Sequence, residues 1–247
     1  MSDGKGVVRL FMGGSFNPIT IAHLRILDLA RDYVHRNLRL QVESAVISPV
    51  GDHYPEKKLQ EASHRVEMCR LATNTPYGSW IKVDDWECKQ DKWIRTRVNL
   101  ERQQQLANED YARQMSLEIE EDGSDPEPGE TRKTIIPKIM LVCGADTVHS
   151  FGVPGLWSKE DIQAMLEDYG ILCITRKGYQ VPEELKGLVK PNYCFSGIHE
   201  IEEWIPNEIS STKVRYGLKN GLTIQHIVPD PVLTYIRERS LYETEPM

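Results

Sequence analysis

Short apolar runs alternate with helical patterns along most of this 247-residue chain. The runs that suit a buried strand are VVRLFM, VESAVISPV, KIMLVCG and YGILCIT (7–12, 42–50, 138–144 and 169–175). Helical spacing of apolar residues occupies the intervals, most clearly at 24–34, 61–73 and 161–169. Strands that are apolar on both faces belong in a parallel sheet covered by helices on both sides. The sequence therefore predicts an α/β fold with a Rossmann-like, doubly wound parallel sheet.

The remaining segments continue this pattern less regularly. Further strands are expected at 80–86 and within 192–204, and further helices at 90–115, 209–221 and 230–239. Residues 116–134 differ, because they combine many acidic residues with Pro and Gly and have almost nothing to bury. They predict a disordered or mobile acidic insertion within a single domain that spans 1–247.

The composition excludes several classes of protein. A formal net charge of −7 provides no basic surface for a nucleic-acid backbone. The five cysteines are odd in number and contain no CxxC pair, which indicates reduced thiols and a reducing compartment. No apolar stretch reaches the length of a membrane span, and the first residues lack the apolar core of a signal peptide. We therefore expect a soluble intracellular protein, cytoplasmic or nuclear.

The loop between the first predicted strand and helix reads MGGSFNPITIAH. Its two glycines let the backbone approach a ligand, and the helix that begins near Ile21 directs free N–H groups at the same loop. Thr20 and His23 are three residues apart, so both lie on one face of that helix end. The spacing matches neither a P-loop nor GxGxxG. The loop is either a plain βα turn or an anion-binding segment.

A second segment with anion-binding character is EISSTKVR (208–215). Lys213 and Arg215 lie in the first turn of a predicted helix, where positive side chains interact unfavourably with the helix dipole. An unfavourable local placement of this kind indicates a functional role. A helix N-cap followed by chance basic residues is the alternative. The carboxyl ends of parallel strands share one edge, so this segment is expected to meet the loops at 13–23, 48–58 and 144–157 there. Together the two segments favour phosphate chemistry.

Seven short blocks, spread from about residue 7 to residue 243, carry a more specific signal. They are GSFNPITIAHLR (14–25), ISPVGDHY (47–54), HRVEM (64–68), VDDWE (83–87), LVCGAD (141–146), LW (156–157) and NEISSTKVR (207–215). In this order they resemble the eukaryotic nicotinamide mononucleotide adenylyltransferase family. The resemblance implies a nucleotidyltransferase-type sheet and transfer of AMP from ATP to nicotinamide mononucleotide, and also to nicotinic acid mononucleotide. The products would be NAD, or its acid analogue, and pyrophosphate.

The resemblance also implies roles for individual residues. His23 would contact the ATP phosphates and, with Lys213 and Arg215, supply positive charge for catalysis. Trp86 would stack on the nicotinamide ring. The other implied nucleotide-binding residues are Gly14, Ser15, Phe16, Thr20, Tyr54, Lys57, Gly144, Asp146, Leu156, Trp157, Asn207, Ser211 and Thr212.

One position departs from the family pattern. Relatives often carry lysine two residues after the tyrosine of the second block, whereas Tyr54 is followed at that position by Glu56. Either Lys57 or Lys58 takes over the phosphate contact, or the contact is lost.

The implied reaction is an in-line attack by a phosphate oxygen on the α-phosphorus of ATP. Its nucleophile is already an anion, so positioning and electrostatic stabilisation are needed and a general base is not. Mg²⁺ held by ATP oxygens and water would complete the positive charge, and no carboxylate cluster suggests a metal site built by the protein alone.

Other functions remain compatible with the sequence. They are another nucleotidyltransferase of the same fold, a dinucleotide-dependent oxidoreductase, and a non-enzymatic chaperone or scaffold role alongside catalysis. The sequence leaves open the preference between the amide and acid mononucleotides. It leaves open the oligomeric state as well, and a homo-oligomer is compatible with it.

Overall fold

A six-stranded parallel sheet with the order β3-β2-β1-β4-β5-β6 forms the centre of the computed structural model. The structure describes residues 6–54, 59–122, 136–175, 181–182, 185, 195–205 and 207–242. The strands are β1 (Val7–Gly14), β2 (Gln41–Pro49), β3 (Ile81–Val83), β4 (Lys138–Gly144), β5 (Ile171–Thr175) and β6 (Ile198–Glu202). This strand order is the doubly wound arrangement that the alternating apolar runs predict.

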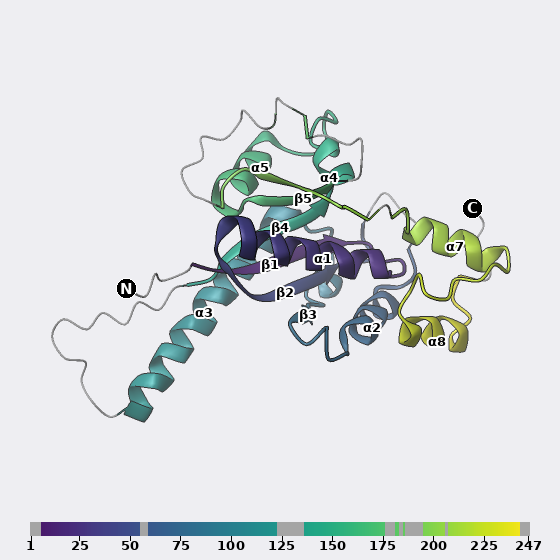
Figure 1. Cartoon of the computed structure of the whole chain (residues 1–247), viewed down its shortest axis with the longest axis horizontal. Coiled ribbons are helices and arrows are strands. Elements are labelled where there is room, and N and C mark those ends of the chain that lie inside the picture. The colour runs from purple at the N-terminus through teal and green to yellow at the C-terminus, as the bar shows by residue number, and fades with distance from the viewer. Residues whose placement is uncertain are drawn as a thin grey trace.

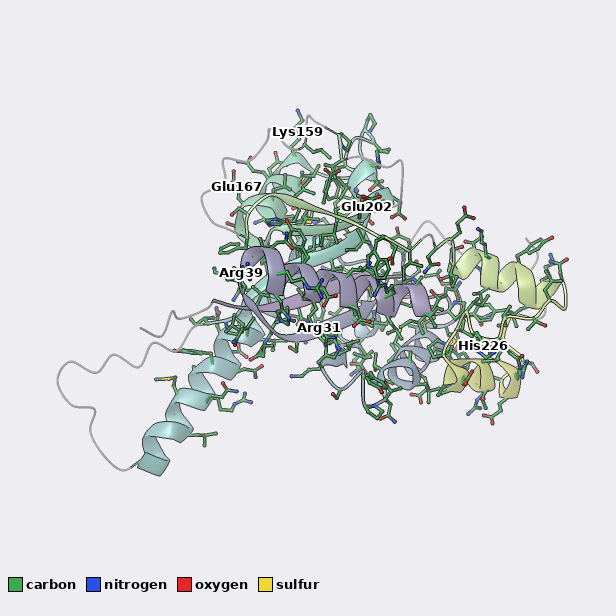
Figure 2. The ribbon with its side chains drawn as sticks, viewed as in Figure 1. Arg31, Arg39, Lys159, Glu167, Glu202 and His226 are labelled. Carbon is green, nitrogen blue, oxygen red and sulfur yellow. The ribbon has the colours of Figure 1, made fainter. Side chains whose placement is uncertain are left out.

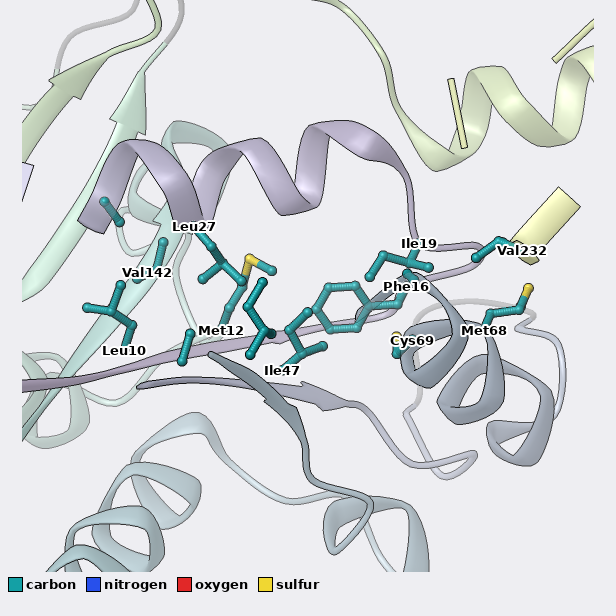
Figure 3. Close-up of a cluster of buried hydrophobic side chains, with 14 of the residues drawn as sticks. Leu10, Met12, Phe16, Ile19, Leu27, Ile47, Met68, Cys69, Val142 and Val232 are labelled. Carbon is teal, nitrogen blue, oxygen red and sulfur yellow. The ribbon is translucent and has the colours of Figure 1, made fainter. Parts of the chain in front are cut away.

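One face of the sheet is covered by α1 (Ile21–Tyr33), α2 (Ala62–Thr73) and α8 (Asp230–Glu238). Leu10 and Met12 of β1 point to this face, and Figure 3 shows them with Phe16 beneath α1. A π-helical turn, Val34–Leu38, continues α1, and α7 (Ser211–Lys219) adds Val214 to the same buried cluster.

The opposite face is covered by α3 (Thr96–Asp122), α4 (Ala145–Ser150) and α5 (Lys159–Ala164). Here Phe11 of β1 and Val46 of β2 meet Leu100 and Ala107 of α3. Two short turns complete this side, Glu87–Lys89 before α3 and Met165–Tyr169 after α5. Because β1 and β2 alternate their apolar residues between two covered faces, residues 8–12 of β1 and 44–49 of β2 are all buried, as the sequence predicts.

Two segments differ from the sequence-based expectation. The strand expected at 80–86 is limited to Ile81–Val83, because the Asp84 carboxylate accepts a hydrogen bond from the Trp86 N–H at 3.0 Å and turns the chain. The acidic insertion does not begin at residue 116, since α3 continues to Asp122 through residues that are good helix formers. Figure 1 shows this part of α3 projecting from the body of the molecule. Residues 123–134 of the predicted insertion lie outside the described residues.

No helix within the described ranges is both long enough and apolar enough to cross a membrane.

Candidate active site

The loops that follow β1, β2, β3, β4 and β6 meet at one edge of the sheet, because all the strands run in the same direction. Figure 1 shows this edge beside α7, at the ends of the strand arrows. Backbone hydrogen bonds join neighbouring loops: the Val50 N–H donates to the Gly14 oxygen, and the Asp84 N–H to the Ile47 oxygen, each at 2.9 Å. The convergence expected from the sequence is therefore confirmed for these loops.

A fully buried arginine of α2, Arg65, holds the loops after β1 and β2 together. Its guanidinium donates to the main-chain oxygens of Ser15 (2.9 Å), Val50 (2.7 Å) and Gln60 (2.7 Å). It also pairs with the Asp52 carboxylate at 3.0 Å. Sequence reasoning assigned Arg65 no role, although it lies in the HRVEM block. A charged residue at an otherwise apolar helix position was the available signal.

The two segments with anion-binding character contact each other directly. Arg215 of α7 donates from Nη1 to the main-chain oxygen of Asn17 at 2.7 Å. The Ser211 hydroxyl donates to the Pro18 oxygen at 2.8 Å, and the Tyr242 hydroxyl donates to Oδ1 of Asn17 at 2.9 Å. The start of α7 is thereby fixed against the loop that precedes α1.

His23 occupies the third position of α1 and bonds back to Thr20 at the helix start. Its Nδ1 accepts the Thr20 backbone N–H at 3.0 Å and lies 2.8 Å from the Thr20 hydroxyl. A backbone N–H can only donate, so the ring proton of neutral His23 lies on Nε2. The edge of the Phe16 ring packs against the imidazole, with ring centroids 5.2 Å apart. His23 is thus held in one orientation with a single N–H donor available.

Burial lowers the pKa of His23 to about 4, and the negative charge of Asp146 offsets part of this effect. His23 is therefore neutral near pH 7 in the free protein. The sequence reading counts His23 among the positive groups, whereas in the free protein desolvation of the imidazole favours its neutral form. In this state the Nε2–H of His23 is a neutral hydrogen-bond donor.

The turn after β4 lies next to the loop after β1, because β1 and β4 are neighbouring parallel strands. Asp146 lies in the first turn of α4, directly after Gly144. A Cβ atom at Gly144 would lie 2.6 Å from Oδ1 of Asp146, so a larger residue there would displace the carboxylate. Glycine is required at this position to keep Asp146 where it is.

Lys213 extends from the first turn of α7 and forms an ion pair with Glu208 at 2.5 Å. The pair is exposed, so its partners can separate at little cost when a ligand competes. Thr212 lies 3.5 Å from Nη2 of Arg215, and the Asn207 side chain accepts the Ile209 N–H at 2.8 Å. Lys213 is committed to a neighbouring carboxylate in the free protein.

The predicted aromatic residues lie in two separate loops. The Arg102 guanidinium lies over the ring of Trp86, 4.7 Å from its centroid. Trp157 packs edge-on against Phe151 and donates its ring N–H to Ser150 at 2.9 Å. Trp93, which sequence reasoning did not consider, is 44% exposed in the same loop as Trp86. An exposed indole in a loop at this edge is a further candidate for stacking on a ligand ring.

The first turns of α3 hold the loop that carries Trp86. Asn99 donates to the buried carboxylate of Glu87 at 2.7 Å, and burial raises the pKa of Glu87 to about 7. Gln103 donates to Asp84 at 2.6 Å, and Arg102 forms an ion pair with the same carboxylate. α3 therefore determines where this loop and its indole lie.

Comparison with known proteins gives evidence on family that is independent of this geometry. The cytidylyltransferase-like family matches residues 11–217. The nicotinamide/nicotinic acid mononucleotide adenylyltransferase 1 of Bos taurus is 40% identical over 98% of this chain and 90% of the relative. The nicotinamide/nicotinic acid mononucleotide adenylyltransferase of Oryza sativa is 34% identical over 97% of this chain and 87% of the relative. The chain belongs to the nicotinamide/nicotinic acid mononucleotide adenylyltransferase family. The resemblance inferred from the seven blocks is thereby confirmed.

A solved structure supports the fold of this adenylyltransferase family member. The nicotinic acid mononucleotide adenylyltransferase of Plasmodium falciparum, complexed with NaAD, has a TM-score of 0.63 to it and 21% sequence identity. The alignment covers 98% of both chains. The nucleotidyltransferase-type sheet is therefore confirmed.

Within this fold the structure brings one group of predicted site residues together around the loop before α1. They are Gly14, Ser15, Phe16, Thr20, His23, Gly144, Asp146, Ser211 and Arg215. The side chains of Phe16 and Thr20 are buried, so these two residues position the loop and His23. Among the described residues, no hydrogen bond, ion pair or ring contact joins Trp86, Leu156 or Trp157 to this group. Tyr54 lies in the turn after β2, with its N–H on the Gly51 oxygen at 3.3 Å, and Lys57 lies outside the described residues.

Proposed function

We propose that this protein transfers the adenylyl group of ATP to the phosphate of nicotinamide mononucleotide or nicotinic acid mononucleotide. A phosphate oxygen of the mononucleotide forms a bond to the α-phosphorus, and the bond from that phosphorus to the leaving pyrophosphate breaks. The observation that carries the proposal is the direct joining of the loop before α1 to the start of α7 by Arg215 and Ser211. The names of the relatives above support the choice of mononucleotides.

His23 would donate its Nε2–H to a phosphate oxygen of ATP. Thr20 keeps the opposite nitrogen occupied, so the imidazole cannot turn the wrong atom to the ligand. A neutral donor suits this reaction because the attacking phosphate brings no proton that must be removed. A hydrogen bond that strengthens as charge builds on the phosphates stabilises the transition state.

Lys213 would leave Glu208 and pair with the phosphates once ATP is bound. The exposure of the ion pair makes the exchange inexpensive, and a triphosphate attracts an ammonium group more strongly than one solvated carboxylate does. Arg215 would act mainly by holding the Asn17 carbonyl, which keeps the two halves of the phosphate site in register. Asp146 would accept hydrogen bonds from ribose hydroxyls.

Mg²⁺ is the cation proposed to accompany ATP. The part of the chain that the structure describes contains no group of three or more His, Cys, Asp or Glu side chains arranged to hold a metal. The proposed ion would be bound through ATP oxygens and water. When bound, the ion would neutralise phosphate charge during the transfer.

The test combines the purified chain with ATP, Mg²⁺ and each mononucleotide in turn. Pyrophosphate release should occur with both mononucleotides, and a coupled dehydrogenase should detect NAD only with the amide. Phosphopantetheine and phosphocholine, with ATP or CTP, serve as controls for another nucleotidyltransferase. Release of pyrophosphate with a control acceptor and with neither mononucleotide would refute the proposal.

A further inference from the structure

A cavity of about 430 Å³ lies well away from the proposed active site, between the sheet and the second half of α3. Its walls come from Arg9 at the start of β1, Ser44 at the start of β2, and Lys82 of β3. Asp110 and Arg113 of α3 close it from the other side. In Figure 1 this half of α3 projects to the lower left, whereas the carboxyl ends of the strands lie toward α7. The cavity and the proposed active site therefore lie at different ends of the sheet.

The floor of the cavity contains a guanidinium that is held in place. The Arg9 side chain is only 11% exposed; it donates from Nη1 to Asp110 at 2.9 Å and from Nε to Glu43. Both carboxylates at the cavity are therefore already paired with Arg9. They repel an incoming anion less than two unpaired carboxylates would.

Ser44 supplies a buried donor without a partner. The residue is 4% exposed, and its hydroxyl has no hydrogen-bond partner in the described part of the chain. It lies two residues before Val46, which packs against α3, so its side chain emerges on the same face of the sheet as the cavity. Buried hydroxyls are normally hydrogen-bonded, and an unpaired one next to a cavity indicates room for an acceptor.

Two further cations at the cavity are not committed to close ion pairs. Lys82 has no ion pair among the described residues. Arg113 is 72% exposed, and its closest carboxylate is Asp110 at 4.0 Å. With Arg9, the cavity carries three cations against the two carboxylates of Glu43 and Asp110. The residues that line the cavity therefore carry more positive than negative charge, although the whole chain has a net charge of −7.

We propose that this cavity binds a small anionic metabolite through a phosphate or carboxylate group. The oxygens of that group accept hydrogen bonds from the Ser44 hydroxyl and the Lys82 and Arg113 side chains. Hydrogen bonds to an ionised acceptor, and above all those from the cations of Lys82 and Arg113, are stronger than hydrogen bonds between neutral groups. The volume is in the range of small-molecule sites. The proposal does not depend on the reaction at the opposite edge of the sheet.

The probes are inorganic phosphate and, separately, succinate, titrated into the ¹⁵N-labelled full chain and followed by amide NMR. We expect saturable shifts of the Ser44, Lys82 and Arg113 amides with at least one probe. Phosphate alone would identify a phosphate site and succinate alone a carboxylate site. Shifts confined to the loops around His23 would overturn the proposal, because phosphate would then occupy only the catalytic edge.

A double variant, Lys82→Gln with Arg113→Gln, tests whether the cavity causes these shifts. Both residues are exposed, so the fold should persist. The affinity measured at the Ser44 amide should fall about tenfold or more, because two charge-assisted hydrogen bonds are lost. Lys159→Gln is the matched control, since Figure 2 shows Lys159 far from the projecting half of α3. Unchanged affinity in the double variant, or an equal loss in the control, would overturn the proposal.

Discussion

Replacing Arg65 by methionine should destabilise the protein strongly, because this one side chain supports two loops of the active site. The guanidinium is fully buried and donates to three main-chain oxygens as well as to Asp52. Methionine replaces much of the aliphatic stem but none of the donors. The variant would leave three carbonyls to find water or remain unpaired.

The magnitude follows from these contacts. A buried acceptor left without its partner costs about 1–3 kcal/mol, and three carbonyl oxygens lose theirs. We expect the free energy of unfolding to fall by about 3–5 kcal/mol, in the lower part of the resulting range, since Asp52 is half exposed and can be rehydrated. For a chain of this length, each kcal/mol lowers Tm by about 2–4 °C, so Tm should fall by about 6–20 °C.

Arg70→Met is the matched control, because Arg70 lies on the same helix with its side chain 50% exposed. It pairs with Asp85 at 2.9 Å and with Glu67 at 4.0 Å, and loss of such exposed pairs costs about 0–1 kcal/mol. Thermal and urea denaturation of both variants, with adenylyl transfer measured well below Tm, provides the assay. If Arg65→Met unfolds no more easily than Arg70→Met, the assigned role of Arg65 is wrong.

The remaining predictions concern the site itself. His23→Ala should lower kcat by roughly 10²–10³ without loss of fold, as for removal of one transition-state donor, and wild-type turnover would contradict this role. Because the folded pKa of His23 is lowered to about 4 from 6.5, the unfolded chain binds more protons between these pH values. Stability should therefore fall as pH drops from 6.5 toward 4, and less so in His23→Gln, as denaturation across that range will show. Gly144→Ala should raise the KM of a nucleotide by displacing Asp146, whereas an unchanged KM would show that the turn adapts. Trp86→Ala and Trp93→Ala, compared by the KM of the mononucleotide, will show which indole stacks on the base; if neither changes it, the ring binds elsewhere.

The sheet could be predicted from the sequence because its strands are apolar on both faces. Leu10 and Phe11 are adjacent in the chain and belong to buried clusters on opposite faces of the sheet. Two neighbouring apolar residues of this kind are expected in a strand that is covered on both faces. The end of α3 could not be predicted, because two properties of the same residues conflict. Their acidic composition suggested an insertion, whereas the helix propensity of leucine and glutamate favours a helix, which continues to Asp122.

The sequence predicted which residues lie together at the site better than it predicted their charge states. Spacing alone places Thr20 beside His23 on a helix end, and the hydrogen bond between them confirms it. The charge of His23 depends on burial by other segments and on Asp146, which is more than a hundred residues away in the sequence. Local patterns contain no information on either, so the sequence could not show that the imidazole of His23 is neutral in the free protein.

The free protein keeps little uncommitted positive charge at the proposed phosphate site. His23 is neutral, Arg215 donates to the Asn17 carbonyl, and Lys213 is paired with Glu208. Two unpaired cations beside an empty loop would repel each other, whereas Glu208 compensates the charge of Lys213 and the Asn17 carbonyl holds the guanidinium of Arg215 in place. On the proposed mechanism ATP would exchange one exposed ion pair, that of Lys213, while Arg215 would continue to hold the loop. Substrate binding would then recruit charge from Lys213 and leave the contact between α7 and the loop before α1 intact.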